Sequence, residues 1–459
     1  MASFEALRKK HLADMRGFAA EAIERLSWSR DRVLEEQTLQ LRTIVAAAQQ
    51  KSPFHAGRLG HLEASTLEVG DLAKIPPMTK ADVMTHWDNV VTDRRLKLDD
   101  VNAHLKRLLS GEETNAYYLD EYYAAATGGS SGKRGLFLWD WETFVITTNI
   151  TTRMETQQDL LQPLAGPKRT AVVCAGSYVH ASRLLFPSMV DSERDVLVLP
   201  ANTAIRTMVD RLNAFQPDRL IGYSSIVEEL CAEALDGRLQ INLQRISTNS
   251  EPLPQQARDM ALQVWGTNIH NQWGSVEIGV AGTEGNSYSG MTIAEDFVIF
   301  EPVDDHDQPV AEAAQADRLL VTKLYGQVMP MIRYELTDTV VLDGGPNPDA
   351  PGYRRITEVK GRADNWFVYP DDTKIHPMIF RSILGQEPHI SEYQVRQTPT
   401  GARVLAMTHG DIPGDALKAA LIRSLAEGGL TNADVSIEVV PDLPRHPETN
   451  KLRRFVPLS

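Results

Sequence analysis

Residues 127–135 have the composition of a phosphate-binding loop. They read Thr-Gly-Gly-Ser-Ser-Gly-Lys-Arg-Gly and lie between two short runs, 122–127 and 136–139, that are typical of strands. Glycines let a backbone approach an anion closely, exposed N–H groups and hydroxyls donate to it, and Lys133 offsets its charge. The segment therefore predicts that the protein uses a nucleotide triphosphate. The alternative is an ordinary hairpin loop, because Gly and Ser fill many turns.

The same segment excludes a P-loop NTPase. That motif requires G-x-x-x-x-G-K followed by Ser or Thr, whose hydroxyl ligates magnesium at the start of a helix. Here the first glycine of the pattern is replaced by Thr127, and Lys133 is followed by Arg134. The next segment is also strand-like rather than helical. The triphosphate must therefore be handled by other machinery.

Bulk properties limit the classes of protein. At 459 residues, two to four domains are expected. The net charge of -14 argues against a nucleic-acid binder, which normally carries a basic face. The two cysteines, Cys174 and Cys231, lie in apolar contexts and predict buried free thiols in a reducing compartment. No apolar run reaches the roughly 18–20 residues that span a bilayer, and the amphipathic N-terminus carries four acidic residues, which is unlike a targeting peptide. We expect a soluble cytoplasmic protein that binds neither nucleic acid nor membrane.

Regular elements must position this loop. Apolar stripes predict two helices within residues 1–50, and Thr79 with Asp82 predicts a capping box at the next helix. Short Val/Leu-rich strands then alternate with helical segments, which predicts a layered α/β body whose parallel-rich sheets are buried on both faces. The predicted strands are 170–175, 195–199, 219–222, 245–248, 297–300 and 319–322.

The C-terminal part has a different pattern. Strands at 393–397 and 404–408, a helix at 413–425 and a strand at 435–440 predict a small α+β domain. We therefore divide the chain into a body of residues 1–360 with a helical lead-in over 1–90, a hinge at 361–364, and a mobile lid at 365–459. A small cap on a large body is a common way to close a site against water.

Four further segments follow the glycine-rich loop in a fixed order: 271–277, 333–338, 361–364 and 447–454. They read Asn-Gln-Trp-Gly-Ser-Val-Glu, Arg-Tyr-Glu-Leu-Thr-Asp, Gly-Arg-Ala-Asp and Pro-Glu-Thr-Asn-Lys-Leu-Arg-Arg, and we expect the first on a turn after a strand. In this order the chain resembles the adenylate-forming (ANL) superfamily, and within it the phenylacetate-CoA ligase family. The resemblance spans nearly the whole length and includes the segments 52–55, 75–80, 216–224 and 249–252.

The resemblance implies a role for each matched residue. Lys451 and Glu277 would be catalytic, with Glu277 ligating Mg²⁺ and Lys451 binding the substrate carboxylate and the nucleotide. Asp338 would accept the ribose hydroxyls, and Asp364 would be the hinge about which the lid turns. The remaining nucleotide-binding residues would be Thr127, Gly129, Ser130, Ser131, Gly132, Lys133, Ser250, Glu251, Pro252, Asn271, Trp273, Gly274 and Arg362. Compact aromatic or polar side chains would line the acid pocket, namely Tyr178, His180, Tyr223 and Trp273.

Some residues depart from the family pattern, and simpler interpretations stay open. Val276 replaces the usual hydroxyl residue before the glutamate, so one expected donor to the AMP phosphate is missing. Asn450 replaces the usual glycine before the catalytic lysine. Taken singly, Glu277 and Asp338 could be solvated loop acids, Lys451 a surface lysine and His180 a structural histidine.

The resemblance implies an activity in two steps. An acid would be activated by ATP and Mg²⁺ as an adenylate with release of pyrophosphate, and would then be transferred to CoA. The acid is expected to be small, compact or aromatic. The alternatives are transfer to an amine or a carrier protein, or a non-catalytic nucleotide-binding relative. The oligomeric state is left open, with a homodimer as one option.

Overall fold

The fold is described from a computed structural model. The described residues are 4–126, 135–166, 169–188, 195–250, 253, 255–304, 306–311, 316, 318–336, 338–360, 367–369, 373–375, 377–387, 389–444 and 454–458. The chain begins with two long helices, as its apolar stripes predict. The helices before the first strand are α1 (Phe4–Glu24), α2 (Arg30–Lys51), α3 (Pro53–Leu59), α4 (Lys80–Thr85), α5 (Trp87–Val90) and α6 (Leu98–Ser110). The capping box at α4 is confirmed, since the Thr79 hydroxyl accepts from Asp82 N and the Asp82 carboxylate accepts from Thr79 N.

The main sheet has the strand order β14-β15-β10-β9-β8-β7-β6-β4-β5. Its strands β5, β4, β6, β7 and β8 are mutually parallel, whereas β8 pairs antiparallel with β9 and the sheet continues antiparallel to β14. The bounds are β4 (Arg169–Cys174), β5 (Asp195–Pro200), β6 (Arg219–Tyr223), β7 (Arg245–Asn249), β8 (Ile269–Ser275), β9 (Gly279–Glu284), β10 (Met291–Ile293), β14 (Thr339–Asp343) and β15 (Arg355–Lys360).

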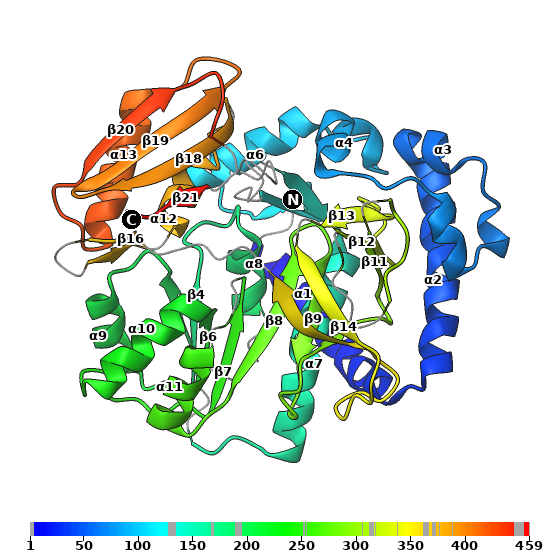
Figure 1. The fold of residues 1–459 in the computed structure, drawn as a ribbon, viewed down its shortest axis with the longest axis horizontal. Coiled ribbons are helices and arrows are strands. Elements are labelled where there is room, and N and C mark those ends of the chain that lie inside the picture. The colour runs from blue at the N-terminus through cyan, green and yellow to red at the C-terminus, as the bar shows by residue number, and fades with distance from the viewer. Residues whose placement is uncertain are drawn as a thin grey trace.

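Helices cover both faces of the parallel part (Figure 1). The helices are α7 (Trp141–Leu161), α8 (Ala181–Ser188), α9 (Ile205–Phe215), α10 (Ser224–Leu235) and α11 (Gln255–Trp265). On β4, Ala171 and Val173 pack into the core under α9–α11, whereas Val172 and Cys174 pack into the core that α1 and α7 share. This alternation is the expected signature of a strand buried on both faces. Cys174 and Cys231 are buried and free, as their contexts predict.

The prediction of burial on both faces is wrong for β5, because it is an edge strand. Its first residues are exposed, and Val196 is 40% exposed. The strands predicted at 297–300 and 319–322 also lie outside the main sheet. They form an antiparallel sheet with the order β11-β12-β13, where β11 is Val298–Val303, β12 is Arg318–Lys323 and β13 is Tyr334–Leu336. The layered α/β fold class itself is confirmed.

The two strands predicted around the glycine-rich segment are also present. They belong to the antiparallel sheet β1-β2-β3, with β1 at Tyr117–Tyr118, β2 at Tyr122–Ala126 and β3 at Leu136–Trp139. Ala126 pairs with Leu136, so the segment between them connects two adjacent strand ends. Residues 127–134 themselves lie outside the described part of the chain.

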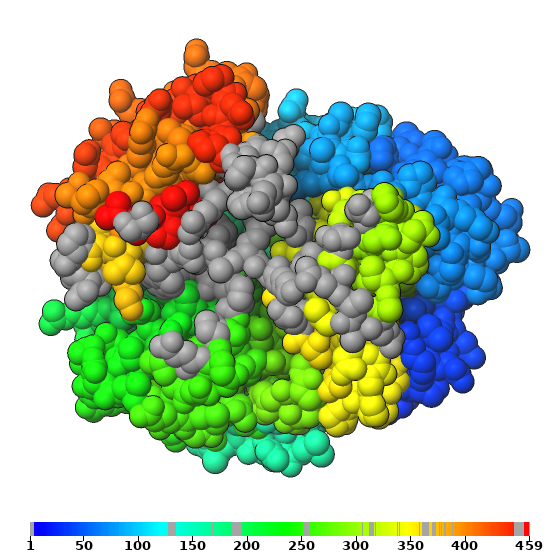
Figure 2. Space-filling model, in the orientation of Figure 1, coloured from blue at the N-terminus to red at the C-terminus, as the bar shows by residue number. Residues whose placement is uncertain are grey.

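The C-terminal residues build their own core, and the predicted β-β-α-β order is present. One hydrophobic cluster draws its members only from residues 367–455 of the described chain. The elements are β16 (Phe367–Val368), β17 (Lys374–Ile375), α12 (Met378–Leu384), β18 (Ile390–Thr398), β19 (Gly401–Thr408), α13 (Gly414–Glu427), β20 (Asp434–Val439) and β21 (Phe455–Val456). Figure 2 shows this part, in orange and red, beside the green body. An ion pair joins the two parts, with 2.5 Å between Lys374 Nζ and the Glu229 carboxylate.

A buried ion cluster fixes the N-terminal helices on the body. Asp296, which is fully buried, accepts two hydrogen bonds from the Arg153 guanidinium at 2.8 and 3.0 Å. Arg30, in α2, pairs with Glu295 at 2.6 Å, and Arg354 pairs with the same carboxylate at 2.8 Å. Charges taken out of water are tolerated where they are paired in this way. The first helices are therefore an integral part of the body.

Candidate active site

The carboxyl ends of the parallel strands lie along one edge of the main sheet. Tyr223, the last residue of β6, lies opposite Asn249, the last residue of β7, and Thr248 lies opposite Asn271 in β8. In open α/β sheets, ligands bind outside the carboxyl ends of the strands. Since the predicted site residues follow β4, β6, β7 and β8, this edge is the candidate active site.

Glu277 lies on a tight turn between β8 and β9. The sequence predicted that the aromatic ring, the glycine and the carboxylate of this motif share a turn, and this is wrong for two of them. Trp273 and Gly274 lie within β8, paired with β9 across a register shift. A side chain at Gly274 would collide with the backbone of Gly279, so the glycine is what allows the two strands to approach and the pairing to continue.

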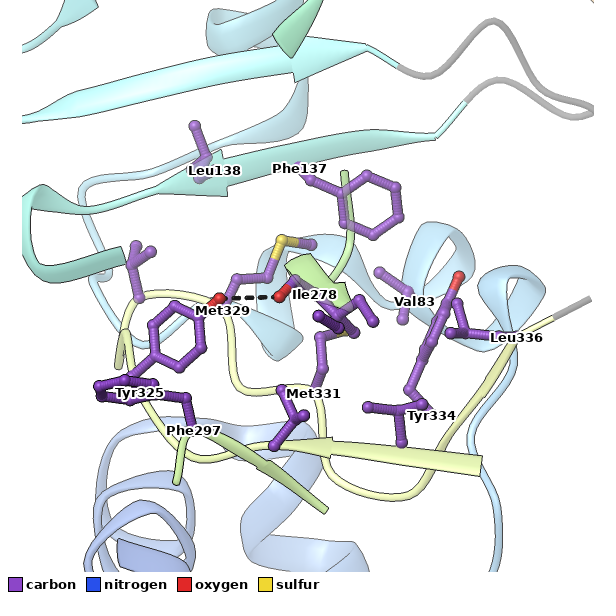
Figure 3. Close-up of a cluster of buried hydrophobic side chains, with 14 of the residues drawn as sticks. Val83, Phe137, Leu138, Ile278, Phe297, Tyr325, Met329, Met331, Tyr334 and Leu336 are labelled. Atoms are coloured by element: carbon purple, nitrogen blue, oxygen red, sulfur yellow. Dashed lines mark hydrogen bonds between the residues drawn. The ribbon is translucent and has the colours of Figure 1, made fainter. Parts of the chain in front are cut away.

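Two donors from distant elements hold the backbone of this turn. Trp139 Nε1 donates to Val276 O at 2.9 Å, and the Tyr325 hydroxyl donates to Ile278 O at 2.8 Å (Figure 3). Gly279 follows with a φ of +76°, where an added Cβ would lie 2.6 Å from the Tyr325 hydroxyl. The turn is thus fixed at both of its peptide carbonyls, and Glu277 lies between them.

The Glu277 carboxylate itself is half-exposed. Within the described residues its hydrogen bond is to the Tyr334 hydroxyl, with 3.5 Å between the two oxygens. Burial raises the pKa of Tyr334 well above its usual value, and the neighbouring Glu277 charge raises it further, so this hydroxyl stays protonated and can donate. A single carboxylate that is not used in an ion pair of the described chain suits Mg²⁺, which typically combines one or two carboxylates with substrate phosphates. The described residues contain no self-sufficient cluster of metal ligands.

The described ends of the glycine-rich segment lie near other site elements. Ala126 N donates to Val179 O at 2.8 Å, which joins the start of the segment to the loop that carries Tyr178 and His180. At the other end, a Cβ on Gly135 would lie 2.6 Å from Lys80 Cε. The sequence did not single out Lys80 as a site residue, although it belongs to the motif at 75–80.

The motif at 75–80 is joined to the strand that carries Tyr334. Met78 N donates to Arg333 O at 3.0 Å, and Glu335 N donates to Met78 O at 2.9 Å. Arg333 has a φ of 55°, and its guanidinium donates to Ile75 O at 2.7 Å. A bulky residue in the left-handed region persists only where its surroundings hold it there. Contacts therefore lead from the end of the glycine-rich segment through Lys80 and Met78 to Tyr334 and Glu277.

Three predicted nucleotide-binding residues lie at strand ends or within the sheet edge. Ser250 is exposed directly after β7, and its φ of 67° is unusual for a residue other than glycine. Asn271 is buried, and its side-chain oxygen accepts from the Thr248 hydroxyl at 3.0 Å. Asp338 is half-buried between β13 and β14. Their roles toward a nucleotide stay predictions.

The residues predicted to line an acid pocket lie in different surroundings. Tyr223 is buried, with its hydroxyl 3.0 Å from Ser182 Oγ. Tyr178 is 37% exposed, with its ring near Phe4 of α1. His180 faces the C-terminal part, where its Nε2 lies 3.4 Å from Gln386 Nε2. Trp273 packs edge-on against Phe300. A common pocket for these side chains stays a prediction.

Strand β8 also carries two buried donors, one on the predicted site residue Trp273 and one on Ser275, which the sequence did not single out. Trp273 Nε1 and Ser275 Oγ are buried and have no hydrogen-bond partner in the described chain. Buried donors without partners are rare in proteins and are a recurrent sign of a ligand or water. Both residues belong to the motif at 271–277, but its pattern does not reveal which of its polar atoms are left without partners.

Several predicted site residues lie outside the described part of the chain. They are Thr127, Gly129, Ser130, Ser131, Gly132, Lys133, Glu251, Pro252, Arg362, Asp364 and Lys451. The hinge and lid boundaries near residue 361 also stay predictions. In the described chain, no helix combines the length and apolar character that crossing a bilayer needs.

Comparison with known proteins identifies the fold. No family model matches the sequence. Protein CapK of Staphylococcus aureus is 22% identical over 331 residues, which are 70% of this chain and 66% of CapK, just under two thirds of that relative. A solved structure of 2-hydroxyisobutyryl-CoA ligase with 2-HIB-AMP and CoA in the thioesterification state is 15% identical in sequence. The match covers 92% of this chain and 89% of the ligase chain, with a TM-score of 0.59. The match to the open conformation of the same ligase covers 94% of this chain and 92% of the ligase chain, with a TM-score of 0.57 and 15% identity.

The chain therefore has the fold of an adenylate-forming ligase. The resemblance that the ordered motifs predict is confirmed at the level of the fold, over nearly the whole length.

Proposed function

We propose that the protein activates a small acid with ATP as an adenylate, releases pyrophosphate, and transfers the acid to CoA. The observation that carries this proposal is the Glu277 carboxylate, held on a fixed turn at the carboxyl edge of the parallel sheet. The fold adds support, because 2-hydroxyisobutyryl-CoA ligase has been observed with 2-HIB-AMP and CoA. The ordered motifs described above support the assignment of each role.

In the first half-reaction, a carboxylate oxygen of the acid attacks the α-phosphorus of ATP. The new P–O bond forms as the bond from the α-phosphorus to the bridging oxygen breaks, and pyrophosphate leaves with that electron pair. Glu277 would hold Mg²⁺, which supplies charge neutralisation for the phosphates when bound. The chain's own contribution is positioning and electrostatic stabilisation by Lys451, the segment 127–135 and the ribose-binding Asp338. No protein nucleophile is required.

The unpartnered donors of β8 could replace the hydroxyl donor that Val276 lacks. Ser275 Oγ, one residue earlier, is buried without a partner in the described chain, as is Trp273 Nε1. We assign these two donors to the polar groups of the bound nucleotide. Hydrogen bonds to the nucleotide would then offset the free-energy cost of burying these donors without partners, which is about 1–3 kcal/mol for each group.

In the second half-reaction, the CoA sulfur attacks the acyl carbon and AMP leaves. The C-terminal part would turn about Asp364 between the two steps. Several hydrogen bonds and an ion pair join the described residues of the C-terminal part to the body. They include the Lys374–Glu229 ion pair, with Lys374 exposed, and a 3.4 Å hydrogen bond from Asn202 to Ser424. An ion pair with an exposed partner contributes about 0–1 kcal/mol, so breaking the Lys374–Glu229 pair is compatible with domain rotation.

The acid is expected to be compact or aromatic. An amine or a carrier protein is the alternative acceptor, and a non-catalytic nucleotide-binding protein is the alternative to an enzyme. The protein is expected to act in the cytoplasm, and a homodimer is compatible with this chemistry.

A pyrophosphate-exchange assay with ATP, Mg²⁺ and a panel of acids tests the proposal. Exchange that depends on one class of acid is the expected result, and adding CoA should then release AMP and form a thioester. Substituting Lys451→Ala should lower exchange on the order of 10²-fold or more while sparing thioester formation from preformed adenylate. Lys418→Ala, on the exposed face of α13, is the matched control. Exchange that no acid stimulates would favour the nucleotide-binding alternative, and equal loss in both half-reactions would refute the role of Lys451.

A further inference from the structure

A cavity of about 230 Å³ lies apart from the Glu277 turn, between α1, strand β5 and the loop that follows β4. Among the described residues that line it, the charged ones are two arginines, Arg8 and Arg183, and none is a carboxylate. The chain carries 61 acidic and 47 basic residues, yet the charged members of the described lining are both basic. The charge of the lining favours an anion.

Neither guanidinium is neutralised by the described chain. Arg8 and Arg183 form no ion pair with any acidic residue of the described parts. Arg183 Nε is buried and has no hydrogen-bond partner there, while the guanidinium lies over the Tyr178 ring at 5.0 Å. Stacking on an aromatic ring orients a guanidinium and leaves its N–H fork available to a planar anion. A buried donor without a partner is a feature that native proteins normally satisfy with a ligand or water.

The rest of the lining is apolar or aromatic. Phe4, Tyr123 and Tyr178 supply rings, and Val196 supplies an aliphatic wall on the exposed edge strand β5. Walls of this kind suit the body of a small organic molecule rather than a polyphosphate, which needs glycines, backbone N–H groups and lysines. Guanidinium groups pair with planar carboxylates through two parallel hydrogen bonds.

We propose that this cavity binds a compact aromatic carboxylate, with its charged group at Arg8 and Arg183 and its ring against the aromatic side chains of the lining. Tyr178, which the sequence assigns to the acid pocket, lines this cavity, whereas Glu277, Trp273 and Tyr223 do not. The inference does not depend on the proposed function. The cavity is nevertheless connected to the candidate active site. Tyr178 precedes Val179, whose carbonyl accepts from Ala126, and Tyr123 lies in the same strand as Ala126.

The connection gives the bound acid a route to influence the glycine-rich segment. A ligand seated on Tyr123 and Tyr178 contacts the two elements that meet at the Ala126–Val179 hydrogen bond. The segment 127–135 begins at the next residue. We therefore assign the cavity as an effector site that senses a compact carboxylate.

The test is titration of benzoate into the full chain by isothermal calorimetry, without ATP or Mg²⁺. Benzamide is the neutral probe of nearly the same shape. Arg183→Met and Arg8→Met remove one guanidinium each, and Arg8→Met, at the partly exposed start of α1, keeps the test available if Arg183→Met fails to fold. Arg107→Met, on the exposed face of α6 and away from the cavity lining, is the matched control.

The expected result is benzoate binding that weakens about tenfold or more in either cavity variant, stays unchanged in Arg107→Met, and is weaker by a similar factor for benzamide. Benzoate that also binds as a substrate would add a second site whose affinity the cavity variants leave unchanged. No benzoate binding, equal binding of benzamide, or unchanged affinity and stoichiometry in the cavity variants would overturn the proposal. Pyrophosphate exchange, read separately, reports on the proposed function.

Discussion

Tyr325→Phe tests whether the turn that carries Glu277 must be held by a distant side chain. The substitution removes one hydroxyl and keeps the ring. That hydroxyl donates to Ile278 O at 2.8 Å and lies 3.1 Å from the Thr147 hydroxyl, in a fully buried environment. Its loss leaves the Ile278 carbonyl without this donor. Leaving a buried polar group unsatisfied costs about 1–3 kcal/mol, and we expect the free energy of unfolding to fall by about 2 kcal/mol.

The second expected effect is on the chemistry. The Trp139–Val276 hydrogen bond remains, so the turn should loosen rather than unfold. If Glu277 holds Mg²⁺, a looser turn should lower pyrophosphate exchange about tenfold at limiting Mg²⁺. Much of this loss should be recovered at saturating Mg²⁺, because the chemical groups themselves are intact. Exchange is measured over a range of Mg²⁺ concentrations, and stability by urea-induced unfolding.

Tyr369→Phe provides a matched control. The Tyr369 hydroxyl also donates to a buried carbonyl, that of Gly401 at 2.9 Å, but it lies in the C-terminal part away from the turn. Both substitutions should lower stability to a similar extent, whereas only Tyr325→Phe should change the Mg²⁺ requirement. The reasoning is refuted if Tyr325→Phe is destabilised with an unchanged Mg²⁺ requirement, or if Tyr369→Phe changes that requirement equally.

Two further predictions concern stability. Asp296→Asn leaves the buried Arg153 guanidinium without its charged partner and should lower the free energy of unfolding by about 3–5 kcal/mol. The double variant Arg153→Met/Asp296→Leu should lose less stability than the sum of the losses in Arg153→Met and Asp296→Leu. Additive losses in urea titrations would contradict this. Burial lowers the pKa of His11 and of His55 from 6.5 to about 3 in the folded protein. Between pH 6.5 and pH 3 these two histidines therefore bind more protons in the unfolded chain than in the folded protein. They contribute stability near neutral pH that is lost as the pH falls toward 3. The loss is about 2 kcal/mol for each between pH 7 and pH 5, and His11→Phe should remove one such contribution; a variant with the same pH dependence as the parent protein would refute the assignment.

Local sequence patterns were sufficient for much of the fold. Alternating apolar strands and amphipathic helices predict the layered body, and the β-β-α-β order of the C-terminal part follows from the same periodicities. The capping box at Thr79 and Asp82 was predictable because its two partners are three residues apart. Ordered motifs also placed Glu277 and Asp338 among the candidate residues. These features depend on residues that are close together along the chain, and their spacing can be read from the sequence.

The arrangement of the site was decided by the tertiary structure. The donors that hold the Glu277 turn come from Trp139 and Tyr325, which are 137 and 47 residues from the carbonyls they bind. The pattern of a motif does not say which distant side chain will reach its backbone, because that depends on how the sheets and helices pack. For the same reason, only the fold brings Arg8 and Arg183 to one cavity and leaves their charges unpaired within the described chain. The sequence by itself determined the elements and the candidate chemistry, and packing between distant elements determined which groups meet.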